Sequence, residues 1–121
     1  MSWLGGSAAL AVLSFDVDAE SPILAMGRRY ADHAMVMTHQ AYGPLVGVPR
    51  LLDLLGEYGL PATFFVPGLT AERYPSTVER IAAAGHEIGH HSYSHRSPVD
   101  LSEAGERADF ERALVALERF G

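Results

Sequence analysis

Three short apolar segments alternate with longer segments that have the residue spacing of helices, and this alternation constrains the fold most strongly. The predicted strands cover residues 8–15, 62–66 and 86–89, and the predicted helices cover residues 48–58, 71–84 and 101–120. Apolar runs of this length are typical of strands that are buried on both faces of a sheet. Strands that alternate with helices predict a parallel sheet with right-handed crossovers, which is an α/β fold.

The helix over residues 48–58 has the clearest apolar stripe. Gly59 is a suitable residue to end it, because glycine readily adopts the left-handed conformation found after helices. The residues that we expect to face the core are Leu51, Leu52, Leu54 and Leu55.

The remaining segments have weaker signals. Pro75 predicts a break near the start of the helix over residues 71–84. Ser102 is the predicted N-cap of the third helix, in which Phe110, Leu114 and Leu117 recur at helical spacing. Residues 18–47 lack clean periodicity, so we expect a long functional loop there.

Two carboxylates, Asp16 and Asp18, follow the first predicted strand. Strand side chains alternate between faces, so both acids project to one side and Val17 projects to the other. Two neighbouring carboxylates resist ionising together, and a cation beside them removes that cost. A structural alternative makes Asp18 the cap of a following turn, which explains one acid and not both.

Four histidines lie close together in the segment GHEIGHHSYSH. His86 and His90 fit H-E-x-x-H, the signature of zinc metalloproteases, but that signature works only on a helix. Gly85 ends the preceding helix and Gly89 would weaken a new one. We therefore interpret residues 86–89 as a short strand, which argues against a protease.

His91 and His95 form a second pair, separated by three residues that favour turns. A loop of this length can aim both imidazoles at one point, although solvated loop histidines are the simpler alternative. The carboxyl ends of parallel strands meet at one edge of a sheet, where α/β folds build their sites. Two histidines with one carboxylate are a typical set of ligands for catalytic zinc.

These motifs resemble the polysaccharide deacetylase family, also called the NodB-homology family. FDVDAE resembles its first motif and HSYSH its second, and the segments YGPLVGVPRLLDLLGEYGLPATFFVPG and AAAGHEIGHHSYSHRSP are also similar. They resemble most closely a branch with bacterial peptidoglycan deacetylases and allantoinase-like and cyclic-imide hydrolases. The resemblance implies that Asp16 is the catalytic base and that Asp18, His91 and His95 bind the metal. It gives no ligand role to His86 or His90.

The resemblance also implies a fold and an activity. Residues 1–121 would be the N-terminal portion of a distorted, incomplete (β/α) barrel, with about three β-α units. The activity would be metal-dependent hydrolysis of a non-peptide carbon–nitrogen bond, with zinc as the expected ion. The substrate would be an acetamido sugar, which loses its acetyl group, or a small amide or imide. A different class of function is a truncated, non-catalytic module for metal binding or assembly.

A complete β/α barrel takes about 250 residues, and this chain has 121. We therefore expect either a fragment or a short protein that assembles with others, and a homo-oligomer that covers the exposed strand edges. The family's later motifs, which include an arginine segment and a late histidine, have no counterpart in this sequence.

Composition limits the partners and the location. The net charge of -6 argues against a nucleic-acid partner. No apolar run reaches the roughly 18 residues that a membrane span needs, and we find no basic segment before an apolar stretch to indicate a secretory signal. The absence of cysteine excludes disulfides and fits a cytoplasmic protein.

Overall fold

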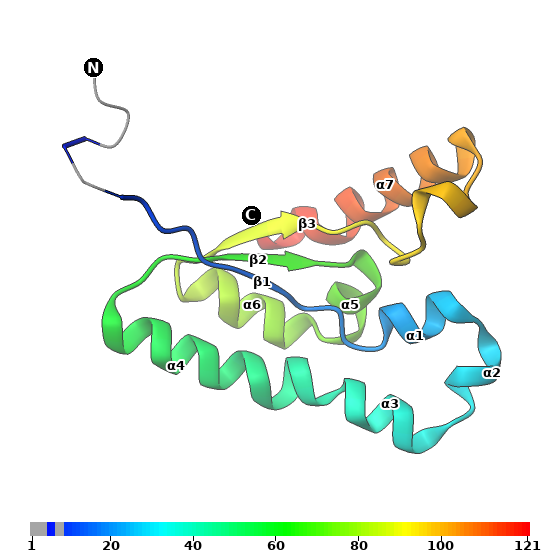
Figure 1. Cartoon of the computed structure of the whole chain (residues 1–121), viewed down its shortest axis with the longest axis horizontal. Coiled ribbons are helices and arrows are strands. Elements are labelled where there is room, and N and C mark those ends of the chain that lie inside the picture. Colours follow the sequence, from blue (N-terminus) through cyan, green and yellow to red (C-terminus); the bar gives the residue numbers. More distant parts are fainter. Residues whose placement is uncertain (1–4, 7–8) are drawn as a thin grey trace.

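Three parallel strands form one open sheet in the order β1-β2-β3, as the alternation of segments predicts (Figure 1). Strand β1 (Ser14–Asp16) pairs with β2 (Thr63–Val66), and β2 pairs with β3 (Glu87–His90). The computed structural model describes residues 5–6 and 9–121. None of the helices in this part of the chain is long and apolar enough to cross a membrane.

The helices lie between and after the strands. They are α1 (Ser21–Met26), α2 (Arg28–Ala31), α3 (Ala34–Gln40), the π-helix η1 (Gly43–Gly47), α4 (Val48–Tyr58), α5 (Gly68–Arg73), α6 (Pro75–Ala83), the 3₁₀ turn η2 (Pro98–Asp100), α7 (Glu103–Leu117) and the 3₁₀ turn η3 (Glu118–Phe120).

The first strand is shorter than predicted. Position 8 of the predicted strand lies outside the described residues, and the strand itself begins only at Ser14. Leu10 and Val12 are 66% and 77% exposed, so the first part of the apolar run is not buried. In the described part of the chain β1 has a single neighbour, β2, and the residues before it have little surface to pack on.

The prediction of a long loop over residues 18–47 is wrong, because this segment is mostly helical. Its helices are short, and Pro22 and Pro44 lie in the first turns of α1 and η1. Proline at that position costs no hydrogen bond and presets the helical φ angle. Helices of one or two turns are too short for a periodic apolar pattern to reveal them.

Helix α4 has the predicted bounds, and Gly59 follows it in the left-handed conformation with φ 61°. Leu55 is buried and Leu51 and Leu52 are partly buried against the core, as predicted. Leu54, however, is 50% exposed. Four leucines within five residues span more of the helix surface than the face that packs on the sheet.

The predicted helix over residues 71–84 is two helices, because the helical conformation is interrupted at Tyr74, immediately before Pro75. Helix α5 begins at Gly68, earlier than predicted. The third strand is β3, which lies one residue later than the predicted range 86–89.

In α7 the predicted N-cap is confirmed, because the Ser102 Oγ accepts a hydrogen bond of 3.2 Å from the Gly105 N–H. Leu117 is buried, but Phe110 and Leu114 are 52% and 42% exposed. The buried position in the middle of this helix is Ala113, whose side chain is too small to stand out in the pattern of large apolar residues.

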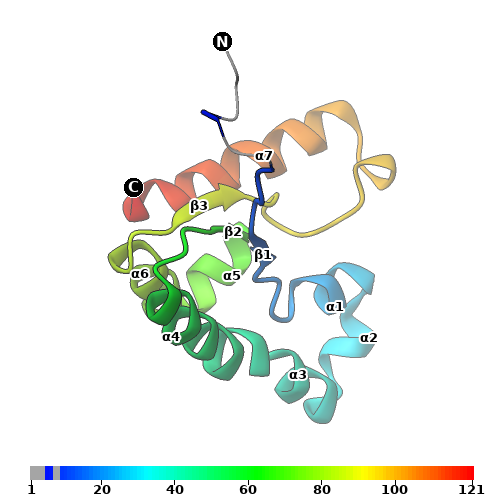
Figure 2. The same ribbon diagram turned by 60° about the vertical axis from the view of Figure 1, so that its left-hand side comes forward.

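The core lies between the sheet and helices α4 and α6, and its largest fully buried side chains include Phe64, Val66, Val78 and Ile81. Figures 1 and 2 show that the three strands point toward the end of the molecule where α1 and the loop after β3 lie. The segments that follow β1 and β3 therefore start from the same edge of the sheet.

Close packing between α5 and α7 generates a first prediction, at Gly68. A Cβ atom on Gly68 would lie 2.6 Å from the Tyr93 Cδ2 and 3.0 Å from the Ala113 Cα. We expect Gly68→Ala to lower the free energy of unfolding by about 1–3 kcal/mol, which is typical of overpacking. Urea denaturation followed by circular dichroism measures this change.

Gly56→Ala is the matched control. Gly56 lies in helix α4, and a Cβ there would meet no atom within 4 Å. This substitution should raise the free energy of unfolding by about 0.5–1 kcal/mol, because alanine favours the helix. Equal stability of the two variants would show that Gly68 is not tightly packed.

Candidate metal centre

Asp18, His91 and His95 come together at the carboxyl-end edge of the sheet. The Asp18 Oδ1 lies 3.4 Å from the His91 Nε2 and 3.5 Å from the His95 Nε2. One ligand atom from each of the three residues lies within 4.8 Å of the others. The three side chains are 30–34% exposed, so the cluster is open to solvent.

The Asp18 carboxylate fits a metal ligand better than a capping group. Its Oδ1 is buried and has no hydrogen-bond partner among the described residues. A tetrahedral ion with bonds of about 2.0–2.1 Å spaces its ligand atoms about 3.3–3.4 Å apart, which is close to the two oxygen–nitrogen distances. Two imidazoles with one carboxylate are donor types that suit zinc or a similar ion, and the two oxygen–nitrogen distances are compatible with such an ion.

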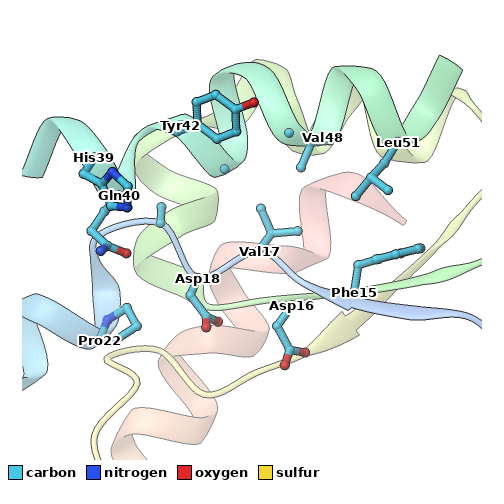
Figure 3. Close-up of a pocket in the computed structure, with 13 residues that line it drawn as sticks. Phe15, Asp16, Val17, Asp18, Pro22, His39, Gln40, Tyr42, Val48 and Leu51 are labelled. Atoms are coloured by element: carbon cyan, nitrogen blue, oxygen red, sulfur yellow. The ribbon is translucent and has the colours of Figure 1, made fainter. Parts of the chain in front are cut away.

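Asp16 lies beside this cluster and does not belong to it. Figure 3 shows the Asp16 and Asp18 side chains on the same side of the chain, with Val17 directed the opposite way toward α4. The Asp16 side chain is exposed, whereas Val17 is 4% exposed in the core. The predicted alternation of the three side chains is confirmed, and the catalytic role of Asp16 stays a prediction.

A cleft of about 320 Å³ extends from these acids toward α3 and η1. Val48 and Leu51 of α4 supply apolar surface, and the polar side chains that line it include His39, Gln40 and Tyr42 (Figure 3). The segment that was predicted as a loop thus forms one wall of the candidate site.

Backbone strain is concentrated in the two loops that carry the candidate ligands. Among the described residues, the non-glycine residues with positive φ are Ala19 at 51°, Ser92 at 56° and His95 at 57°. His95 is itself a candidate ligand, and Ala19 and Ser92 directly follow the candidate ligands Asp18 and His91. Each such conformation costs about 1–3 kcal/mol and persists only where the surrounding contacts require it.

The loop that carries Asp18 is fixed through its backbone carbonyl. The Ser21 Oγ and the Thr70 Oγ1 each donate a 2.7 Å hydrogen bond to the Asp18 carbonyl oxygen. Two residues later, the buried Glu20 accepts a 2.6 Å hydrogen bond from the Tyr74 hydroxyl. Burial and the hydrogen bond to the Glu20 carboxylate raise the pKa of Tyr74 to about 12.

The loop that carries the histidines rests on the first turn of α5. The Gly68 and Leu69 N–H groups donate to the carbonyl oxygens of Ser92 and Tyr93 at 2.9 and 3.1 Å. The Tyr93 hydroxyl donates to the Glu72 Oε2 at 2.7 Å. Burial and this hydrogen bond raise the pKa of Tyr93. The tyrosine between the two histidines therefore anchors the loop in the protein interior.

His86 and His90 take no part in the cluster, as predicted. Glu87 and His90 belong to strand β3, so the H-E-x-x-H pattern lacks the helix that a metalloprotease needs. The His86 ring packs against Phe64 with ring centroids 5.4 Å apart. The His90 ring packs against Phe110 of α7 at 4.1 Å.

Sequence reasoning missed the residues that support the ligands, above all Glu20, Thr70 and Asp109. The position of Glu20 could have suggested a supporting role, since a carboxylate two residues after a candidate ligand is a plausible neighbour of it. The positions of Thr70 and Asp109 could not, because they lie 52 and 15 residues from the groups that they contact.

Comparisons with known proteins identify the family and the fold. The family model described as polysaccharide deacetylase matches residues 31–121. A peptidoglycan deacetylase of Helicobacter pylori is 47% identical over 57 residues, which are 47% of this chain and 20% of the relative. A chitooligosaccharide deacetylase of Sinorhizobium fredii is 42% identical over 74 residues, which are 61% of this chain and 33% of the relative.

A solved structure extends the likeness to almost the whole chain. A Mycobacterium smegmatis protein assigned as a polysaccharide deacetylase superposes with a TM-score of 0.94 at 52% identity, over 99% of this chain and 42% of that protein. This match confirms the expected fold, the N-terminal part of a (β/α) barrel. The chain spans about a fifth to a third of the curated relatives. The matched family and the shared fold establish that the chain belongs to the polysaccharide deacetylase family.

Proposed function

We propose that this protein is a metal-dependent hydrolase that removes the acetyl group from an acetamido sugar. The observation that carries the proposal is the buried Asp18 Oδ1, which has no hydrogen-bond partner in the described part of the chain and has an imidazole nitrogen of His91 and of His95 3.4–3.5 Å away. We propose zinc as the ion, with these three residues as its ligands. When bound, such an ion supplies Lewis acidity, which polarises an amide carbonyl and makes water a stronger nucleophile.

The residues of the chain supply the rest of the chemistry that we propose. Asp16 is exposed and lies on the same side as Asp18, so its carboxylate is free to take a proton from the attacking water. The three clustered side chains are about one-third exposed, so a substrate can reach them from solvent. Val48 and Leu51 give the adjoining cleft apolar surface, and His39 and Gln40 give it polar groups that orient a substrate.

The names of the relatives support a carbohydrate substrate, because they refer to peptidoglycan and chitooligosaccharide deacetylation. Acetate release from N-acetylated chitooligosaccharides, compared with hydrolysis of a small cyclic imide, tests this choice. If the protein hydrolyses only the imide, the proposed substrate class would change from an acetamido sugar to a small amide or imide. A cytoplasmic location and self-association of the chain stay predictions from its composition and open sheet.

The proposal predicts about one divalent ion per chain. His91→Ala and His95→Ala should each lose most of the bound ion, because two remaining ligands hold zinc much more weakly. Elemental analysis of the purified proteins measures the stoichiometry. His86→Ala is the control, since His86 packs on Phe64 outside the cluster and should affect stability more than metal content. Unchanged stoichiometry in both ligand variants would refute the assignment.

Asp16→Asn should separate binding from turnover. The variant should keep its metal, because Asp16 is not one of the three clustered residues. Its rate should fall by about 10²–10⁴, the usual effect of removing a general base. The measurement is acetate release by the protein made from the full reading frame, with metal content determined on the same sample. A variant that retains wild-type turnover would show that Asp16 is not the base.

A further inference from the structure

The loop between β3 and η2 carries two of the three clustered side chains, yet it contains no regular secondary structure. Ser92 and His95 in this loop have φ angles of 56° and 57°. An isolated loop would relax from these conformations and move the imidazoles apart. Within the loop the His95 N–H donates to the Ser92 Oγ at 3.1 Å, and contacts from outside the loop also hold these conformations.

Asp109 of α7 supplies the most directed of these contacts. Its Oδ2 accepts a hydrogen bond from the Tyr93 N–H at 2.7 Å, and its Oδ1 accepts one from the Ser94 N–H at 3.1 Å. These two N–H groups are consecutive and lie midway between His91 and His95. Both oxygens of one carboxylate thus accept hydrogen bonds from the middle of the five-residue motif. Hydrogen bonds to a charged acceptor are stronger than hydrogen bonds between neutral groups.

His90 makes a second connection from the loop to the same part of α7. Its Nδ1 accepts from the Ser92 N–H at 3.2 Å, and its Nε2 lies 3.1 Å from the Phe110 carbonyl oxygen. A carbonyl oxygen can only accept, so Nε2 carries the hydrogen and both ring nitrogens are used. The histidine that gave the false protease signature therefore links the loop to α7.

We propose that Asp109 is a positioning residue for the metal centre, which acts through the backbone of Tyr93 and Ser94 to aim His91 and His95 at Asp18. His90 assists by fixing Ser92. This inference rests on the proposed metal site. It assigns to α7, a helix that contributes no ligand, the control of the distance between the two imidazoles and the carboxylate.

The test measures binding of Zn²⁺ and of Co²⁺ to the chain without any substrate. Asp109→Ala should weaken Zn²⁺ binding by about 10-fold or more, because residues that orient ligands contribute about 10–100-fold to metal affinity. Asp109→Asn keeps one acceptor oxygen, so its affinity should fall between those of wild type and Asp109→Ala. Isothermal titration with a competing chelator gives the dissociation constants.

The visible absorption of bound Co²⁺ distinguishes positioning from a general effect on stability, because it reports the arrangement of the ligands. We expect the Co²⁺ spectrum of both Asp109 variants to shift, at a temperature where circular dichroism shows them folded. Glu111→Ala, an exposed acid two residues further along α7, is the control and should change neither affinity nor spectrum.

Each outcome has a separate meaning. If the wild-type chain binds neither ion, the proposed metal site fails. If wild type binds, His91→Ala does not, and Asp109→Ala binds with wild-type affinity and spectrum, only the role of Asp109 fails. If Asp109→Ala does not fold, the Asp109→Asn variant decides, since an unchanged Co²⁺ spectrum and affinity there would overturn the proposal.

Discussion

The site depends on a carboxylate oxygen that is buried with no hydrogen-bond donor among residues 5–6 and 9–121. The Asp18 Oδ1 is buried and lies 3.4 and 3.5 Å from the Nε2 atoms of His91 and His95, which is longer than a good hydrogen bond. Leaving such a group unpaired costs about 1–3 kcal/mol or more when it is charged. A fold tolerates this free-energy cost when binding of a ligand offsets it, and a divalent cation would offset it most directly.

The surrounding structure keeps these three groups from relaxing. The carbonyl of Asp18 is bound by two hydroxyl groups, and the histidine loop is hydrogen-bonded to both α5 and α7. Strained φ angles at Ala19, Ser92 and His95 show that the loops do not adopt their locally preferred conformations. Preorganisation of this kind lowers the entropy that a ligand must overcome on binding.

Sequence reasoning could predict the features that depend on local patterns. The order of strands and helices, the bounds of α4 and the placement of Asp16, Asp18, His91 and His95 at one edge of the sheet follow from apolar runs, turn residues and the geometry of parallel sheets. The choice of Asp18 rather than Asp16 as the third candidate ligand came from the family resemblance. Helices α1–α3 escaped prediction because one or two turns carry no periodicity. The exposure of Leu10, Val12 and Phe110 escaped it because burial depends on which neighbours are present. Asp109 escaped it because its partners are backbone amides, which every residue has.

The first turn of α5 connects both ligand loops. Thr70 donates to the carbonyl of Asp18, while the N–H groups of Gly68 and Leu69 donate to the loop between His91 and His95. Three consecutive residues therefore set the relative position of candidate ligands that lie more than 70 positions apart in the sequence. We therefore expect few substitutions to be tolerated in this turn, even though it contains no candidate ligand. A homologue that replaces the hydroxyl of Thr70 or the bare backbone of Gly68 would need a compensating change in a loop that is distant in sequence.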